Sequence, residues 1–281
     1  MKRWFAFFAA LSLCLTGCAS TDDSQNDASE PSSSLQDAPA NVTAQGVTLA
    51  APTSLSNTLH SFGQGKQFDD QNRPTSCIQY QEEYGQYNAS FIKEDCGNTI
   101  YLTFDEGYEN GYTAEILDVL KEKNVPAVFF ITGDYLDRSP ELVERMINEG
   151  HAVGNHTENH PSMPSLSAAE MASEINVLGQ RIEEQFGYQT HLFRPPKGEF
   201  SEESLAVTQQ QGYESVFWSF AYADWNPEKQ PDPTTALNTL TERLHPGAIY
   251  LLHAVSSTNA QILGDWIDQT RAAGYEFALL T

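Results

Sequence analysis

Basic residues are scarce in this 281-residue sequence: 15 lysines and arginines stand against 38 aspartates and glutamates, giving a net charge of −23. A chain with so little positive charge neutralises few phosphates, which argues against nucleic acid or an anionic lipid surface as a partner. Cysteines are also few, four in all. No CxxC pair and no nearby histidine completes a set of zinc ligands around Cys77 and Cys96.

Long apolar runs are lacking as well. The stretch WFAFFAALSLCL, which follows Met1-Lys2-Arg3, has 12 residues, whereas a membrane-spanning helix needs about 20. It is typical of a secretory signal peptide, which we place at residues 1–17. The LTGC that follows resembles the lipobox of bacterial lipoproteins, which implies cleavage before Cys18 and a lipid on its thiol. We therefore expect an exported protein anchored by lipid to a bacterial membrane; the alternative is an ordinary secreted protein.

Residues 18–57 are expected to form a flexible tether. From residue 19 onward this segment has no aromatic residue, lysine or arginine, so it buries too little apolar surface to offset its ordering entropy. The next segment, residues 58–97, leads into the main domain and holds Cys77 and Cys96. In an exported protein this pair predicts a disulfide, worth roughly 3 kcal/mol for a loop of that length. Two free thiols are the alternative.

Strand-like and helical runs alternate over residues 98–281. Strands are expected at 100–104, 127–131, 152–154, 192–193, 215–219, 248–252 and 276–280, and helices at 113–123, 140–150, 168–186, 201–211, 235–244 and 260–273. Seven strands with helices between them predict an α/β domain of parallel βα units, closed as a barrel or lying as an open sheet.

Reactive side chains follow these strands at the point where each ends. They are Asp105 and Glu106 after the first, His156 after the third, Arg194 after the fourth, Asp224 beyond the fifth and His253 after the sixth. Ligands bind at the C-terminal ends of parallel strands in barrels and in open sheets alike. The sequence therefore predicts one site that gathers all of these residues.

The segment GNHTENH places His156 and His160 four residues apart. This spacing suits two ligands of one divalent metal ion if the segment makes a helical turn; two surface histidines on a polar loop are the alternative. Asp105 and Glu106 repel each other, so a compensating charge is expected near them. We expect one of the acids to be an oxygen ligand and the other a general base toward the attacking water. Arg194 is expected to hold that base ionised.

Two further groups surround this predicted centre. The prolines of FRPPKG remove two backbone donors, so the next N–H groups, from Lys197 onward, are candidates to face an oxyanion. A contact between Asp224 and His253 would raise the imidazole pKa and suit it to protonate a leaving group. Tyr222 and Trp225 offer flat faces for a sugar ring, with plain packing as the alternative.

Five motifs, TFDEG, HTENH, RPPKG, ADW and LLH, occur in this order. They resemble the motifs of the polysaccharide deacetylases, which are carbohydrate esterase family 4 with the NodB-homology domain. The resemblance covers residues 60–281 and is strongest to the bacterial peptidoglycan N-acetylmuramic acid deacetylases of the δ-lactam type. It implies that residues 98–281 form a distorted (β/α) barrel of seven or eight strands, which hydrolyses acetyl groups on sugars with a divalent metal, zinc.

The family pattern also implies roles for individual residues. Asp105 becomes the general base and His253 the general acid, with Arg194 and Asp224 tuning them, and Glu106, His156 and His160 become the metal ligands. Substrate contacts are expected from Pro196, Lys197, Gly198, Tyr222, Trp225 and Leu251. Three residues depart from the common pattern: Glu106 stands where most members have Asp, Lys197 where many have Tyr, and Ala221 where many have Asp.

The sequence thus predicts a monomeric, metal-dependent hydrolase that removes N-acetyl groups from the glycan strands of peptidoglycan, with N-acetylmuramic acid as the substrate. One alternative keeps the fold and acts on N-acetylglucosamine, chitin or acetylxylan. Another is a lipoprotein that binds wall glycans and whose catalytic site is impaired.

Overall fold

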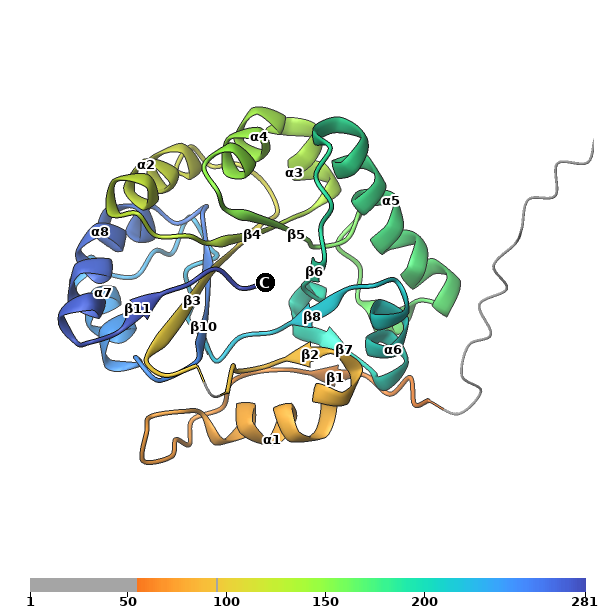
Figure 1. Cartoon of the computed structure of the whole chain (residues 1–281), viewed down its shortest axis with the longest axis horizontal. Coiled ribbons are helices and arrows are strands. Elements are labelled where there is room, and N and C mark those ends of the chain that lie inside the picture. The colour runs from red at the N-terminus through yellow and green to blue at the C-terminus, as the bar shows by residue number, and fades with distance from the viewer. Residues whose placement is uncertain (1–54, 95) are drawn as a thin grey trace, which may run out of the picture. The chain divides into compact units, whose positions relative to one another are not determined.

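The computed structural model describes residues 55–94 and 96–281 (Figure 1). The expected signal peptide, Cys18 and most of the expected tether lie outside these residues. The last residues of that tether already contact the domain, since the Ser56 N–H donates to Glu202 Oε2 at 3.2 Å and Ser201 Oγ donates to Asn57 Oδ1 at 2.7 Å.

A curled parallel sheet forms the centre of the domain, with helices around its outer face (Figure 1). Along the sheet the order is β2-β8-β6-β5-β4-β3-β10-β9, with β11 added beside β3. Among the described residues the two end strands, β2 and β9, do not pair with each other, so the barrel is incompletely closed. The strands are β2 (Ala89–Ser90), β3 (Thr99–Glu106), β4 (Val128–Ile131), β5 (Ala152–Asn155), β6 (Leu192–Phe193), β8 (Glu214–Val216), β9 (Phe220–Ala221), β10 (Ala248–His253) and β11 (Glu276–Phe277). The predicted α/β fold with a distorted barrel is confirmed.

The helices are α1 (Thr75–Tyr84), α2 (Thr113–Lys123), α3 (Gly133–Arg138), α4 (Pro140–Asn148), α5 (Ala168–Phe186), α6 (Glu202–Gln210), α7 (Pro233–Glu242) and α8 (Ser257–Ala272). Local chemistry fixes several of their starts. Ser167 and Glu170 form the predicted capping box of α5, and Pro140 occupies the first turn of α4. None of the helices in the described part of the chain is long and apolar enough to cross a membrane.

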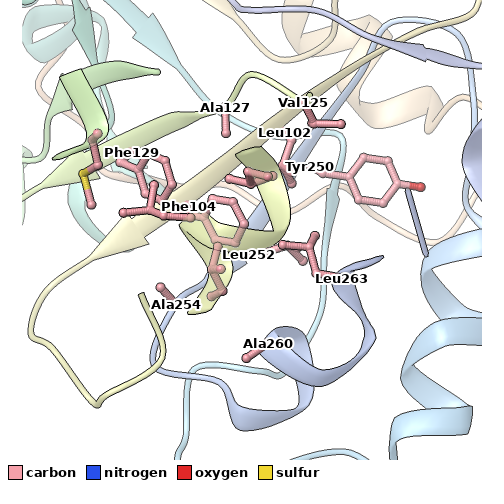
Figure 2. Close-up of a cluster of buried hydrophobic side chains, with 14 of the residues drawn as sticks. Leu102, Phe104, Val125, Ala127, Phe129, Tyr250, Leu252, Ala254, Ala260 and Leu263 are labelled. Atoms are coloured by element: carbon pink, nitrogen blue, oxygen red, sulfur yellow. The ribbon is translucent and has the colours of Figure 1, made fainter. Parts of the chain in front are cut away.

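Side chains of β3 alternate between two surroundings. Ile100, Leu102 and Phe104 belong to the main apolar cluster, which packs the outer face of the sheet against the helices. Figure 2 shows part of this cluster, in which Leu102 and Phe104 of β3 meet Tyr250 and Leu252 of β10 and Leu263 of α8. Each such buried side chain contributes roughly 1.5–3 kcal/mol through the hydrophobic effect. The other series, Tyr101, Thr103 and Asp105, faces the inside of the curl.

The lead-in segment completes the wall of the domain rather than standing apart from it. β1 (His60–Ser61) pairs antiparallel with β7 (Glu199–Phe200), and β2 pairs parallel with β8. Stacked aromatic rings join this segment to the rest, with Phe91 and Phe217 at 4.2 Å between ring centroids.

The predicted disulfide is wrong, because Cys77 and Cys96 are both free thiols. Cys77 lies on the buried face of α1, where its Sγ contacts the Trp218 carbonyl at 3.6 Å. Cys96 Sγ instead contacts the Lys93 carbonyl at 3.6 Å. The spacing of the two cysteines in the sequence could not show that each thiol contacts a different backbone carbonyl.

One predicted strand, residues 215–219, is divided between two parts of the sheet. β8 ends at Val216, and the chain joins the opposite end of the sheet order as β9. The carbonyls of Val216 and Phe217 accept hydrogen bonds from Arg194 at 3.0 and 3.1 Å. A continuing β-ladder would use those acceptors, so the strand stops where the arginine side chain takes them.

Candidate active site

A cavity of about 690 Å³ is lined by the C-terminal ends of the strands. Asp105, His156, His160 and His253 all line it. The parallel register explains part of this convergence, since Asp105 of β3 lies directly beside His253 of β10. The structure therefore brings together the reactive residues that the strand ends predict, with one exception described below.

Arg194 and Asp105 form a buried ion pair. Arg194 Nη1 donates to Asp105 Oδ1 at 2.8 Å, and the guanidinium is fully buried over the Phe130 ring, 4.1 Å from its centroid. Burial would raise the pKa of Asp105, but the charges of Arg194, His156 and His253 and the hydrogen bond from Arg194 together outweigh it, and the pKa is lowered. Asp105 is therefore held ionised inside the cavity.

His156 and His160 lie close together, with ring centroids 4.8 Å apart. The segment between them is a loop and not the expected helical turn, because Thr157 and His160 have positive φ values of 71° and 57°. The Thr157 Oγ1 accepts the His160 N–H at 2.8 Å and closes this loop. The expected helical turn is thus wrong, although the two imidazole rings do lie close together.

His156 has a defined tautomer. Its Nδ1 lies 2.7 Å from the Arg194 carbonyl, which only accepts, so Nδ1 carries the proton and donates. Burial lowers the pKa of His156 to about 4, so the ring is neutral and Nε2 holds a lone pair. Asp105 Oδ2 lies 3.6 Å from His156 Nε2.

Two acceptors that face each other in a buried site fit a bound cation. The Arg194 carbonyl supports the ring in the manner usual for metal-ligating histidines. No group of three His, Cys, Asp or Glu side chains has metal-binding spacing within residues 55–94 and 96–281. His156, His160 and Asp105 Oδ2 are nevertheless donors of the right chemistry, and burial lowers the pKa of His160 as well.

Glu106 is the residue that the structure does not bring into the cavity. It follows the outward series of β3, away from the cavity-lining residues. Its carboxyl is fully buried, and neither oxygen accepts a hydrogen bond from any described residue. Burial and the charges of Glu109 and Asp105 raise its pKa well above the usual range.

His253 and Asp224 make the expected contact. His253 Nδ1 donates to Asp224 Oδ1 at 2.8 Å, while Asp224 Oδ2 accepts the His253 N–H at 2.8 Å and Asn259 Nδ2 at 2.6 Å. Burial would lower the pKa of His253, but the hydrogen bond and charge of Asp224 outweigh it and the pKa is raised. The imidazolium form is therefore favoured, as a general acid requires.

Most of the expected substrate residues line the same cavity: Lys197, Gly198, Tyr222, Trp225 and Leu251. Pro196 is buried and does not line it. Trp225 is 60% exposed, so its ring is open for stacking. Tyr222 donates its hydroxyl to Asn259 Oδ1 and thereby joins the support of Asp224.

Sequence reasoning missed some lining residues, among them Gln64, Tyr108 and Trp218. Tyr108 is a second exposed ring at the cavity, and it lies only three residues after Asp105. An aromatic residue in the loop directly after a catalytic strand was the available signal. Gln64 lies in a loop of the lead-in segment and Trp218 between β8 and β9, and no local pattern marks either residue as part of a site.

Comparison with known proteins agrees with this geometry. The family model described as "Polysaccharide deacetylase" matches residues 92–216. The peptidoglycan-N-acetylmuramic acid deacetylase PdaA of Bacillus subtilis is 43% identical over 192 residues, covering 68% of this chain and 73% of the relative. A peptidoglycan-N-acetylglucosamine deacetylase of Bacillus cereus is 33% identical over 185 residues, 64% of this chain and 66% of the relative.

A solved structure of Bacillus subtilis PdaA, described as a family 4 carbohydrate esterase, superposes with a TM-score of 0.76 at 38% identity. The match covers 80% of this chain and 96% of that structure. Family model, relatives and fold thus agree with the motifs at the strand ends. The chain belongs to the polysaccharide deacetylase family of hydrolases.

Proposed function

We propose that the protein removes the N-acetyl group from N-acetylmuramic acid in the glycan strands of bacterial peptidoglycan. One observation carries the proposal: the Asp105 carboxylate paired with Arg194 and the His253 imidazole hydrogen-bonded to Asp224 line the same cavity. An amide hydrolase needs both groups, a base for the attacking water and an acid for the departing amine.

The residues act on the substrate in the following order. Asp105 accepts a proton from the water that attacks the acetyl carbonyl. His253 then donates its proton to the sugar nitrogen as the carbon–nitrogen bond breaks, and acetate leaves. Arg194 and Asp224 touch neither reactant; they fix the orientation and the protonation of Asp105 and His253. Leu251, buried beside His253 in the cavity lining, offers an apolar contact for the acetyl methyl.

Polysaccharide deacetylases are generally metal-dependent, and we propose that His156 and His160 hold the divalent cation, zinc, in this chain. When bound, it would polarise the acetyl carbonyl and make the attacking water more acidic. Asp105 Oδ2 faces His156, whereas Oδ1 is held by Arg194, so Oδ2 is the oxygen placed to accept the proton of the attacking water.

Lys197 supports muramic acid over N-acetylglucosamine, chitin or acetylxylan as the substrate. This exposed cation lines the cavity and has no carboxylate partner among the described residues. Its φ of 62° is unusual for a residue with a side chain, so the loop holds it there at a conformational cost. Muramic acid carries a lactyl carboxylate that Lys197 can pair with, and the other sugars carry none.

We also propose that the chain is exported, anchored through a lipid on Cys18, and active as a monomer. The relatives named above act on peptidoglycan, which lies outside the cytoplasmic membrane. A tether between the lipid and the catalytic domain would let the cavity reach glycan strands some distance from the membrane surface.

Mass spectrometry of digested muropeptides tests the activity. The zinc-loaded protein should yield muramic residues that have lost their acetyl group, whereas Asp105→Asn should lower the rate by several orders of magnitude. Asp134→Asn, which changes an exposed aspartate on α3, is the matched control and should keep full activity. If only glucosamine residues lose acetyl groups, N-acetylglucosamine and not N-acetylmuramic acid is the substrate. If no acetate is released, a wall-binding lipoprotein with an impaired catalytic site is favoured.

A further inference from the structure

A second cavity adjoins the candidate active site. It has a volume of about 360 Å³ and shares two lining residues, Gln64 and Ala221, with the first. Gln64 is fixed between the two, because its Nε2 donates to the Ala221 carbonyl at 2.8 Å and its Oε1 accepts from Trp218 Nε1 at 3.1 Å. The two cavities therefore adjoin at Gln64 and Ala221, so a polymer whose reacting sugar occupies the first can extend toward the second.

Among the described residues, the lining of the second cavity includes two cations and no carboxylate. Lys66 and Arg243 supply the positive charge. Neither forms an ion pair with any described residue, although acids outnumber bases by 38 to 15 in this chain. The aspartate close by, Asp69, is committed to Arg73 at 2.8 Å. Two cations that stay unpaired in so acidic a protein leave their charge available to a ligand.

Arg243 is also held in place. Its guanidinium lies over the Phe68 ring, 4.3 Å from the centroid. Its backbone carbonyl accepts from His245 Nδ1 at 2.7 Å, and Ser219 Oγ holds the other ring nitrogen at 2.8 Å. These hydrogen bonds fix the backbone at Arg243, and the stacking on Phe68 leaves the edge of the guanidinium open for bidentate binding of a carboxylate or a phosphate.

We propose that the second cavity is a subsite for an anionic substituent, a carboxylate or a phosphate, on the glycan beyond the sugar that is deacetylated. This inference rests on the proposed function for the identity of the polymer. Lys197 meets the reacting sugar, whereas Lys66 and Arg243 meet a group further along the strand. The subsite would favour charged wall polymers over neutral oligosaccharides.

The test compares Lys66→Gln and Arg243→Gln with the wild type. Lys121→Gln, which removes an exposed, unpaired lysine at the end of α2, is the matched control. Calorimetry measures the affinity for three ligands: neutral N-acetylglucosamine oligomers, peptidoglycan strands without stem peptides, and strands that carry a phosphodiester-linked polymer. Each cavity variant should bind the anionic strands about tenfold more weakly, the effect of one lost charge-assisted hydrogen bond, and the neutral oligomers unchanged. Arg243→Lys should lie between.

The strand on which the loss appears identifies the source of the anion. A loss on both kinds of strand means that lactyl carboxylates are recognised, and a loss only on the phosphorylated strands means phosphate. If both variants bind every ligand as tightly as Lys121→Gln does, or if the wild type binds no strand, the subsite is refuted. Acetate release, measured in parallel, keeps the two proposals apart: selective loss of affinity without acetate release would refute the proposed activity and leave the subsite standing.

Discussion

Replacing Asp224 by Asn removes the negative charge next to His253, the candidate general acid, and leaves the side-chain volume almost unchanged. The Asp224 carboxylate is fully buried and accepts three hydrogen bonds, two from His253 and one from Asn259. An asparagine has only one acceptor oxygen, so its NH2 group would face at least one of these three N–H groups, which could then no longer donate. We expect a stability loss of about 1–3 kcal/mol for each buried donor left unpaired.

The same substitution also removes the attraction between the Asp224 carboxylate and the His253 imidazolium, which lowers the pKa of His253. Two unit charges about 4 Å apart interact with roughly 4 kcal/mol at an effective dielectric constant of about 20, which equals about three pKa units. Burial lowers the pKa of His253, and in the variant only the more distant Asp105 still opposes this effect. Allowing for relaxation, we expect the pKa to fall by about one to three units.

The sign of the pH dependence follows from the role of His253. The imidazolium donates a proton, so activity falls as the pH rises through its pKa, which lies above 6.5 in the wild type. Asp105 must be ionised, and because its pKa is lowered from the ordinary value of 3.8, its titration lies below the pH range of the assay. Asp224→Asn should therefore move only the alkaline limb, toward lower pH. The same raised pKa means that the stability His253 contributes is fully present below pH 6.5 and is lost as the pH rises through the folded-state pKa.

The assay is acetate release as kcat/KM between pH 5 and about 9, with the His253 ring protons followed by NMR. Asp134→Asn again serves as the control, since that exposed carboxylate pairs with Arg138 on α3 and does not line the cavity. An alkaline limb that stays in place in Asp224→Asn, with the fold intact, would refute His253 as the acid.

Three further changes probe separate parts of the account. Lys197→Ala should lower kcat/KM on muramic strands about tenfold, the worth of one charge-assisted contact, and spare N-acetylglucosamine oligomers; equal loss on both would remove Lys197 as the specificity residue. Glu106→Gln should leave zinc affinity within about threefold, because its carboxyl lies outside the cavity, whereas a loss of about a hundredfold, typical of a direct metal partner, would restore it as a ligand. Its stability advantage over the wild type should grow as the pH rises above 4.5, since the buried wild-type carboxyl must then keep a proton or carry an uncompensated charge. Cys18→Ala should move the protein from the membrane fraction to the soluble fraction in a cell fractionation, and unchanged membrane association would exclude the lipid anchor.

Local signals predicted much of the fold. The apolar spacing of residues 113–123 gave α2 with its observed bounds, and the capping box at Ser167 gave the start of α5. The short elements escaped because they depend on distant partners. β9 has two residues, and it is a strand only because β10 lies beside it.

The candidate site shows the same division. Strand ends predicted that Asp105, Arg194 and His253 would meet, because parallel strands end on one edge. The separation of Asp105 from Glu106 was also available from the sequence, since adjacent residues of a strand face opposite sides. The second cavity could not be predicted, because Lys66 and Arg243 lie 177 residues apart and meet only through the lead-in segment.

The convergence of strand-end residues around a cation is the claim on which the chemistry depends. Anomalous diffraction from a crystal soaked in zinc measures it directly. We predict a single strong peak within bonding distance of imidazole nitrogens of both His156 and His160, on the side of Asp105 Oδ2. A peak held by Glu106 and Glu109 behind the sheet, or two imidazoles turned away from each other with no peak between them, would contradict the account.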